Sequence, residues 1–280
     1  MKTKASCTAR CRLVDPARLY EEGFRIAVNQ ADSMKNPLAY AKRFTKPYSR
    51  ALSQKYRAFR ARAGSRAPWA NKVLDYFDLF FVDHHIFRAI YANRHEIAPG
   101  VWRSAQPSPA QIAHLARKGL KTVVNLRGER DCGSYRLQVE ACRRHGIKLV
   151  NFQLRSRMAP PAEVFHAARR LFDEVEYPVL LHCKSGADRA GLMSAFFLYM
   201  KEGRPIEEAL KQLSLKFGHF KKSETGVLDY LFERYLADNA SEPVSFFEWL
   251  ETRYDPAEIK RDFQSHGWAN LVVNRALQRE

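Results

Sequence analysis

The sequence lacks several features that define large classes of protein. No window holds the ~18 uncharged apolar residues that a membrane-spanning helix needs, so no span is expected. The first residues contain no apolar segment of the secretory type. The five cysteines are odd in number and spread over 280 residues, which argues against a disulfide framework and for a reducing compartment. Together these absences predict a cytoplasmic protein. Cys7 and Cys11 lack a second ligand pair, so neither a metal site nor a cofactor is expected.

One long stretch has no acidic residues. Eleven Lys or Arg residues and no Asp or Glu occur from Lys35 to Lys72, in a chain of net charge +17. Such charge favours an anionic partner, either lipid headgroups or a heavily phosphorylated substrate, and nucleic acid is the less favoured choice. We predict that residues 1–70 form a basic N-terminal extension, amphipathic or partly disordered, and that residues 71–280 form the catalytic domain with its C-terminal helices.

The extension has one helical pattern. Apolar residues recur at spacings of four and three among basic ones, namely Tyr48, Leu52, Tyr56 and Phe59. Two interpretations stay open. The helix lies on an anionic membrane surface, which makes the protein peripheral there, or its aromatic stripe docks on the neighbouring domain.

The periodicity of the remaining chain predicts the fold. Residues 73–100 are densely apolar but interrupted by charges, which predicts a buried helix. Beyond them, strands are predicted at 101–104, 122–126, 148–154 and 178–183, alternating with helices at 107–118, 135–145 and 161–175. Helices are then expected at 188–202, 205–219, 225–237, 244–253 and 256–264. This order predicts an α/β fold with a central, mostly parallel sheet flanked by helices, and a helical C-terminal part.

The most informative segment is HCKSGADRAG, residues 182–191. Five residues separate Cys183 from Arg189 on a turn from a buried strand into a helix. Such a turn wraps backbone N–H groups around an anion, and the helix N-terminus adds its positive end. This field favours the thiolate of Cys183 as nucleophile, and the planar fork of Arg189 suits phosphate oxygens. The phosphate-binding loop itself is expected to consist of Lys184, Ser185, Gly186 and Ala187.

This segment resembles the Cys-x5-Arg signature of the protein tyrosine and dual-specificity phosphatases. The motifs VWRSAQPSP, TVVNLRGERD and HCKSGADRAG follow one another as in the bacterial dual-specificity-like phosphatases. The resemblance implies the cysteine-phosphatase fold and hydrolysis through a phosphocysteine intermediate. The substrate is then a phosphotyrosine protein, a phosphoinositide or another phospholipid, or an inositol polyphosphate.

Two positions depart from the family pattern. Ala190 stands where the family usually has Ser or Thr after the arginine. The segment from Leu154 to Pro160, where common members carry the general acid, contains no acidic residue. Asp188 is the candidate replacement, because it resembles the Asp before the arginine in myotubularin-like enzymes. Asp131 is the second candidate.

Further residues are expected to support the loop or to border the pocket. His182 is expected to orient the loop, and four basic residues either border the pocket or are ordinary solvated charges: Lys184, Arg127, Arg155 and Arg157. The missing loop acid and Ala190 keep a second hypothesis open, a phosphate-binding module without turnover. The intact Cys183 counts against it. Sulfur transfer of the rhodanese type fits the spacing less well, and the oligomeric state stays open.

Overall fold

The computed structural model describes residues 68–77, 79 and 92–265. The chain divides into two compact units, Met1–Asn71 and Lys72–Glu280, and the sheet belongs to the second. The predicted helix with Tyr48 and Phe59 and nearly all of the basic stretch lie outside the described residues. The boundary between extension and catalytic domain therefore stays a prediction.

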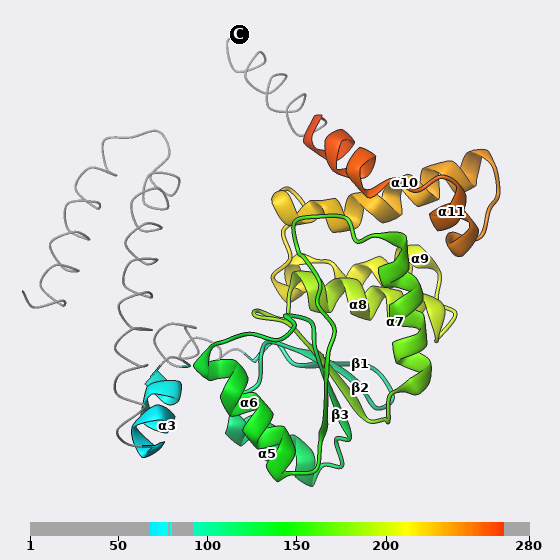
Figure 1. The fold of residues 1–280 in the computed structure, drawn as a ribbon. Helices are drawn as coiled ribbons and strands as arrows, with labels where there is room; N and C mark the ends of the chain where they lie inside the picture. Colours follow the sequence, from blue (N-terminus) through cyan, green and yellow to red (C-terminus); the bar gives the residue numbers. More distant parts are fainter. Residues whose placement is uncertain (1–67, 78, 80–91, 266–280) are drawn as a thin grey trace, which may run out of the picture. The chain divides into compact units, whose positions relative to one another are not determined.

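A five-stranded sheet forms the centre of the second unit (Figure 1). Its order is β1-β2-β5-β3-β4. Only β1 is antiparallel to its neighbour, so the predicted mostly parallel sheet is confirmed. β5 lies between β2 and β3 and follows on directly into the segment with Cys183. The strands are β1 (His95–Ala98), β2 (Val101–Ser104), β3 (Thr122–Asn125), β4 (Lys148–Asn151) and β5 (Val179–His182).

Helices cover both faces of the sheet (Figure 1). α5 and α6 lie on one face, and α7 and α8 lie on the other. Ser108 begins α5 with a capping box, in which its hydroxyl accepts from the Gln111 N–H and the Gln111 side chain accepts from the Ser108 N–H. The bounds are α5 (Pro109–Arg117), α6 (Gly133–Arg144), α7 (Ala162–Glu174), α8 (Asp188–Met200), α10 (Val227–Ser241) and α11 (Phe246–Thr252), followed by a helix at 256–265.

The core follows the two-residue period of the strands. Val123 and Leu180 belong to the smaller cluster under α5 and α6, whereas Val124 and Leu181 belong to the larger cluster under α7 and α8. Burial of each such side chain contributes about 1.5–3 kcal/mol. The central strands are therefore apolar on both faces, which explains why they appear in the sequence as continuous apolar runs.

Two predicted helices are wrong. The segment 73–100 contains the end of α3 (Pro68–Phe77), but residues 95–98 form the edge strand β1, which pairs with β2. The segment 205–219 is broken into α9 (Ile206–Ala209) and two short 3-10 turns, η2 (Leu210–Gln212) and η3 (Leu215–Phe217). The cause is tertiary. Nη1 of the buried Arg103 donates a hydrogen bond to the Gln212 carbonyl oxygen at 2.7 Å. In a continuous helix that oxygen would accept from a backbone N–H of the same helix.

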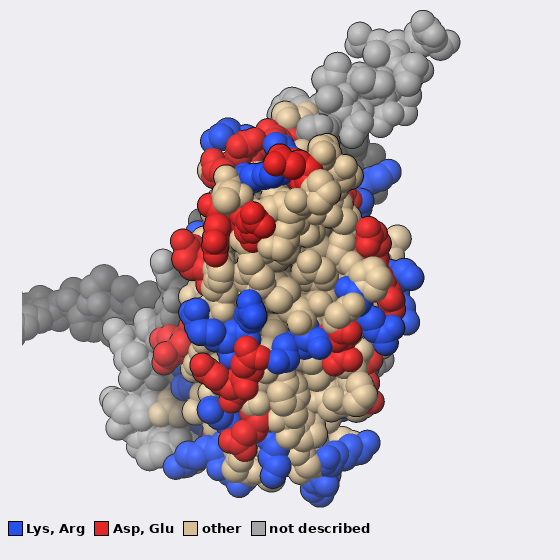
Figure 2. All heavy atoms as spheres, turned by 90° about the vertical axis from the view of Figure 1, so that its right-hand side faces the viewer, with Lys and Arg blue, Asp and Glu red and all other residues tan. Residues whose placement is uncertain are grey.

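Charges of both signs are interspersed on the face that Figure 2 shows. Ion pairs occur among the described residues, such as Arg204 with Glu208 at 3.3 Å. This mixed surface agrees with a net positive charge that is concentrated between Lys35 and Lys72. Among the helices in the described part of the chain, none is long and apolar enough to cross a membrane.

Candidate active site

Cys183 lies at the carboxyl end of the central strand. His182 pairs with Ser104 of β2 on one side and with Asn125 of β3 on the other. The thiol residue follows at once and is only 1 % exposed, and α8 begins at Asp188. The segment 183–187 therefore forms a turn at the edge where the parallel strands end, the usual place for a ligand in such sheets.

The carbonyl groups of this turn are bound from outside. Four successive carbonyls accept hydrogen bonds from groups beyond the turn, and in a planar trans peptide the next N–H points the opposite way. The N–H groups of residues 185–188 are therefore directed toward the inside of the turn, the arrangement of an anion-binding nest. The contacts are Lys184 O with Gln106 N (3.3 Å), Ser185 O with Asn93 Nδ2 (3.0 Å), and Gly186 O and Ala187 O with Arg103 Nη2 (2.6 and 3.1 Å).

The conformation of the turn requires Gly186. Its φ is +74°, in the left-handed region. A Cβ there would lie 2.6 Å from the Ala105 nitrogen and from the Ser104 carbonyl carbon. Both are backbone atoms at the end of β2. No side chain fits between the turn and this strand.

Arg189 follows in the first turn of α8. Its Nε is buried and has no hydrogen-bond partner among the described residues. An unpaired buried donor costs about 1–3 kcal/mol. An oxyanion that accepted a hydrogen bond from this donor would recover that cost.

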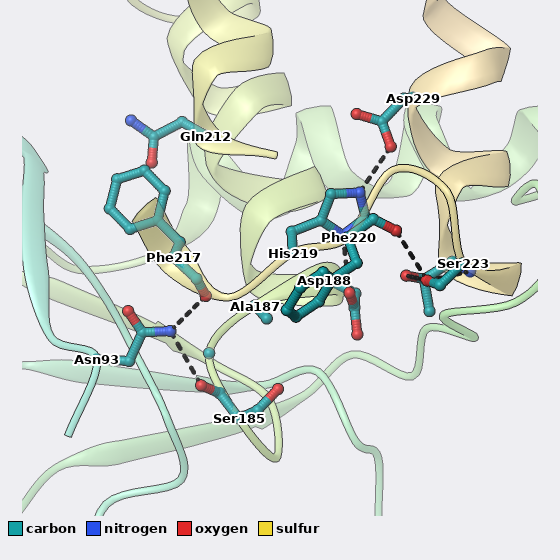
Figure 3. Close-up of polar contacts among 12 residues, drawn as sticks. Asn93, Ser185, Ala187, Asp188, Gln212, Phe217, His219, Phe220, Ser223 and Asp229 are labelled. Atoms are coloured by element: carbon teal, nitrogen blue, oxygen red, sulfur yellow. Dashed lines mark hydrogen bonds and ion pairs between the residues drawn. The ribbon is translucent and has the colours of Figure 1, made fainter. Parts of the chain in front are cut away.

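Asp188 is in contact with a buried histidine that the sequence analysis did not single out. His219 Nδ1 lies 2.7 Å from Asp188 Oδ1, and His219 Nε2 lies 2.6 Å from Asp229 Oδ2 (Figure 3). Burial works to lower the pKa of His219, but the two carboxylates outweigh it and raise the pKa to about 9. The imidazole is therefore a cation at neutral pH and donates from both nitrogens.

His182 lies in a buried polar network behind the turn. Its Nε2 is 2.6 Å from Gln138 Nε2, and its Nδ1 is 3.3 Å from the Cys183 carbonyl oxygen. Gln138 in turn contacts Gln106, which accepts a hydrogen bond from Arg127 Nη1. This network fits the predicted orienting role of His182. Arg127, which belongs to this network, is 7 % exposed.

The remaining predicted residues lie on the surface. Asp131 is 90 % exposed and pairs with Arg136, whereas Arg157 pairs with Glu224 at 3.0 Å. Arg155 contacts Met158 Sδ at 3.5 Å within the same short loop. None of these contacts joins a basic or acidic side chain to the turn 183–187.

The other described cysteines differ from Cys183 in their surroundings. Burial raises the pKa of Cys142 to about 12, which keeps that thiol protonated in the smaller core. Cys132 is partly exposed, with its Sγ 3.4 Å from Ser134 Oγ. In the described ranges no three His, Cys, Asp or Glu residues are grouped to hold a metal ion.

A known family matches the region that holds this turn. The model described as "DSP-PTPase phosphatase fused to NAD+ Kinase" matches residues 84–227. The chain belongs to that family. The resemblance inferred from HCKSGADRAG is thereby confirmed, and the cysteine-phosphatase fold with it.

Curated relatives carry phosphatase names. The chain is 30% identical over 122 residues to "Dual specificity protein phosphatase TpbA" of Pseudomonas aeruginosa strain UCBPP-PA14, which covers 43% of this chain and 53% of the relative. It is 32% identical over 100 residues to "Inositol diphosphatase DSP4" of Arabidopsis thaliana, covering 34% and 48%. The chain thus spans about half the length of the curated relatives it matches. A crystal structure of P. aeruginosa TpbA aligns at 22% identity and a TM-score of 0.42, over 62% of this chain and 92% of that chain.

The sequence analysis missed four polar residues that surround the turn. Asn93 has a φ of 44° and is 3% exposed, while Arg103 is fully buried. His219 and Asp229 complete the group. Periodicity gave no signal for them, since His219 sat in a predicted helix and Asp229 in an amphipathic one. A buried pairing appears only when the chain folds back on itself.

Proposed function

We propose that this chain is a cysteine-dependent phosphatase that hydrolyses phosphomonoesters through a phosphocysteine intermediate. The observation that supports this most is the turn 183–187, in which the four carbonyls of residues 184–187 are bound from outside. The inward N–H groups form a preorganised site for the phosphoryl oxygens. The same turn presents Cys183 at its first position and Arg189 just beyond its end.

The proposed reaction has two steps. The Cys183 thiolate attacks phosphorus in line, an S–P bond forms, and the bond to the leaving oxygen breaks while Asp188 gives that oxygen its proton. Water then attacks the phosphocysteine, with Asp188 taking one of its protons, so that inorganic phosphate leaves and the thiolate returns. The N–H groups and Arg189 hold the equatorial oxygens in both steps.

The substrate class is proposed from the names of the relatives. The relatives are named as a dual-specificity protein phosphatase and an inositol diphosphatase, and one TpbA structure was solved with phosphotyrosine. For this chain we keep a phosphotyrosine protein, a phosphoinositide and an inositol polyphosphate as candidate substrates. We also propose a cytoplasmic location, with contact to anionic membranes through residues 35–72. A lipid substrate predicts that this segment matters for activity on vesicles but not on soluble esters.

Phosphate release from an aryl phosphate, with reductant and without metal, tests the proposal. We expect activity in the wild type, none in Cys183→Ser, and in Asp188→Asn a loss on alkyl phosphates of about 10²-fold or more, the scale of general acid catalysis. An aryl leaving group is a weak base, so the loss in Asp188→Asn should be smaller on it. Activity that survives in Cys183→Ser would contradict the proposal.

The alternative is a phosphate-binding module without turnover. Two observations favour it: Ala190 is fully buried where the family usually has a hydroxyl, and residues 155–160 carry no acid. The nest and Arg189 would still bind a phosphorylated ligand. Binding of a phosphopeptide or phosphoinositide with no release of phosphate on any ester would favour this alternative.

A further inference from the structure

His219 lies fully buried between two carboxylates that belong to different elements. Asp188 opens α8, and Asp229 lies in the first turn of α10. The His219 side chain has no exposed surface, whereas those of Asp188 and Asp229 are 23% and 7% exposed. The ring donates to both, at 2.7 and 2.6 Å. A buried triad of this kind fixes the geometry of its members, because each ring N–H of His219 has a carboxyl oxygen as its acceptor.

The triad leaves one oxygen of Asp188 for chemistry. Oδ1 accepts the His219 Nδ1–H, the other carboxyl oxygen points away from the ring (Figure 3), and the side chain as a whole is 23% exposed. Oδ2 is then the oxygen that a leaving group can meet. His219 itself is sealed from solvent and touches no substrate.

The segment with His219 is tied to the phosphate turn. Asn93 Nδ2 donates both to Ser185 O at 3.0 Å and to Phe217 O at 2.8 Å, and so bridges the two segments (Figure 3). The Arg103 guanidinium, which holds the Gly186 carbonyl, also lies 4.1 Å from the centre of the Phe217 ring. These two contacts fix His219 relative to the turn, so its hydrogen bond can set where Asp188 points.

The lysine that follows His219 most closely in the chain has a partner of its own. Lys221 pairs with Glu233 of α10. Among the groups that the structure describes around the ring, Asp188 and Asp229 are the two that bond to it directly.

We infer that His219, anchored by Asp229, is the positioning residue for Asp188 as the general acid and base of the proposed phosphatase reaction. The inference rests on the proposed function. Before the first step Asp188 carries a proton on Oδ2, and the His219 imidazolium and Asp229 form the ion pair. That proton goes to the departing oxygen in the first step, and Oδ2 takes a proton from the attacking water in the second. His219 keeps both of its ring protons throughout. Placement of a catalytic group to within a fraction of an ångström is a substantial part of its effect.

Two amide variants form a matched pair for the test. In His219→Asn the amide nitrogen falls near the position of Nδ1 and still reaches Asp188, whereas in His219→Gln it falls near Nε2 and reaches Asp229 instead. The readout is kcat on an alkyl phosphate divided by kcat on an aryl phosphate, because only the strongly basic leaving group depends on the acid. We expect His219→Gln to lower this ratio by about tenfold or more and His219→Asn by about threefold.

Further variants separate the possible failures. In an Asp188→Asn background, His219→Gln should lower the ratio no further, because both changes remove one function. A ratio in His219→Gln equal to that of the wild type, in a protein that melts cooperatively, overturns the positioning role alone. A wild type that releases no phosphate, or a Cys183→Ser variant that does, overturns the proposed function and the inference with it.

If the His219 variants do not fold, NMR of the His219 imidazole in the wild type and in Asp188→Asn tests the same contact. The ¹⁵N shifts of His219 should show both nitrogens protonated at neutral pH in the wild type. Asp188→Asn removes one carboxylate and should lower the pKa of the ring. Titration that is the same in the wild type and in Asp188→Asn means that the two side chains do not interact, which overturns the inference.

Discussion

Replacement of Gly186 by alanine tests the geometry of the phosphate turn most directly. At φ +74° an L-residue costs about 1–2 kcal/mol. The added Cβ would also lie 2.6 Å from two backbone atoms at the end of β2. Those atoms belong to a strand inside the sheet and cannot move aside as a flexible side chain can. Overpacking of this kind adds about 1–3 kcal/mol, so the total loss should be about 2–5 kcal/mol.

Gly146→Ala is the matched control. Gly146 has a φ of +65°, and a Cβ there would meet nothing within 4 Å, so only the conformational cost applies. Urea unfolding of both variants and the wild type, analysed by linear extrapolation, gives the two losses. We expect Gly186→Ala to lose at least 1 kcal/mol more than Gly146→Ala and to bind inorganic phosphate more weakly. Equal losses would refute the close approach between the turn and β2.

Two further predictions concern buried charged residues. Arg103→Met removes the donor of the Gly186 and Gln212 carbonyls, whereas Ala187 O keeps the Gly191 N–H. The variant should lower the free energy of unfolding by more than about 2 kcal/mol in urea. A loss below about 1 kcal/mol would contradict the conclusion that Arg103 holds the turn 183–187 through its hydrogen bonds. The pKa of His219 is raised from 6.5 to about 9, so its contribution to stability is complete below about pH 6.5 and is lost as the pH rises through 9. Thermal unfolding at pH 6 and pH 9.5 should show this decline in the wild type and a weaker one in Asp229→Asn.

The sequence predicted the parallel strands of the sheet and the place of the Cys183 turn after β5 well, whereas the role of Cys183 as nucleophile stays a prediction. Val124 and Leu181 lie in continuous apolar runs that only buried strands of a parallel sheet require, and the observed β3 and β5 begin and end within two residues of the prediction. The loop prediction rested on the spacing of Cys183, Gly186 and Arg189, which is local in the chain. Local patterns survive folding because few distant contacts compete with them.

The failures were tertiary in origin. Residues 205–219 have good helix formers, but Arg103, more than a hundred residues away, takes the Gln212 carbonyl and ends the pattern. Residues 95–98 form a strand that pairs with the outer edge of β2, a long-range contact that the local sequence does not show. The sequence contains no indication of a partner for Asp229, whereas in the folded protein it bonds to His219. No periodicity contains such information.

The loop of residues 155–160 has one contact at its C-terminal end and one near its middle. Tyr254 Oη donates to the Pro160 carbonyl at 2.6 Å, and Arg157 pairs with Glu224 across from it. Because the proposed general acid, Asp188, lies on α8, residues 155–160 do not supply the proton. The proposed reaction therefore does not require this loop to close over the substrate. A phosphatase built in this way has a turnover rate that is not gated by loop closure, so its pre-steady-state burst should depend on the leaving group and not on solvent viscosity.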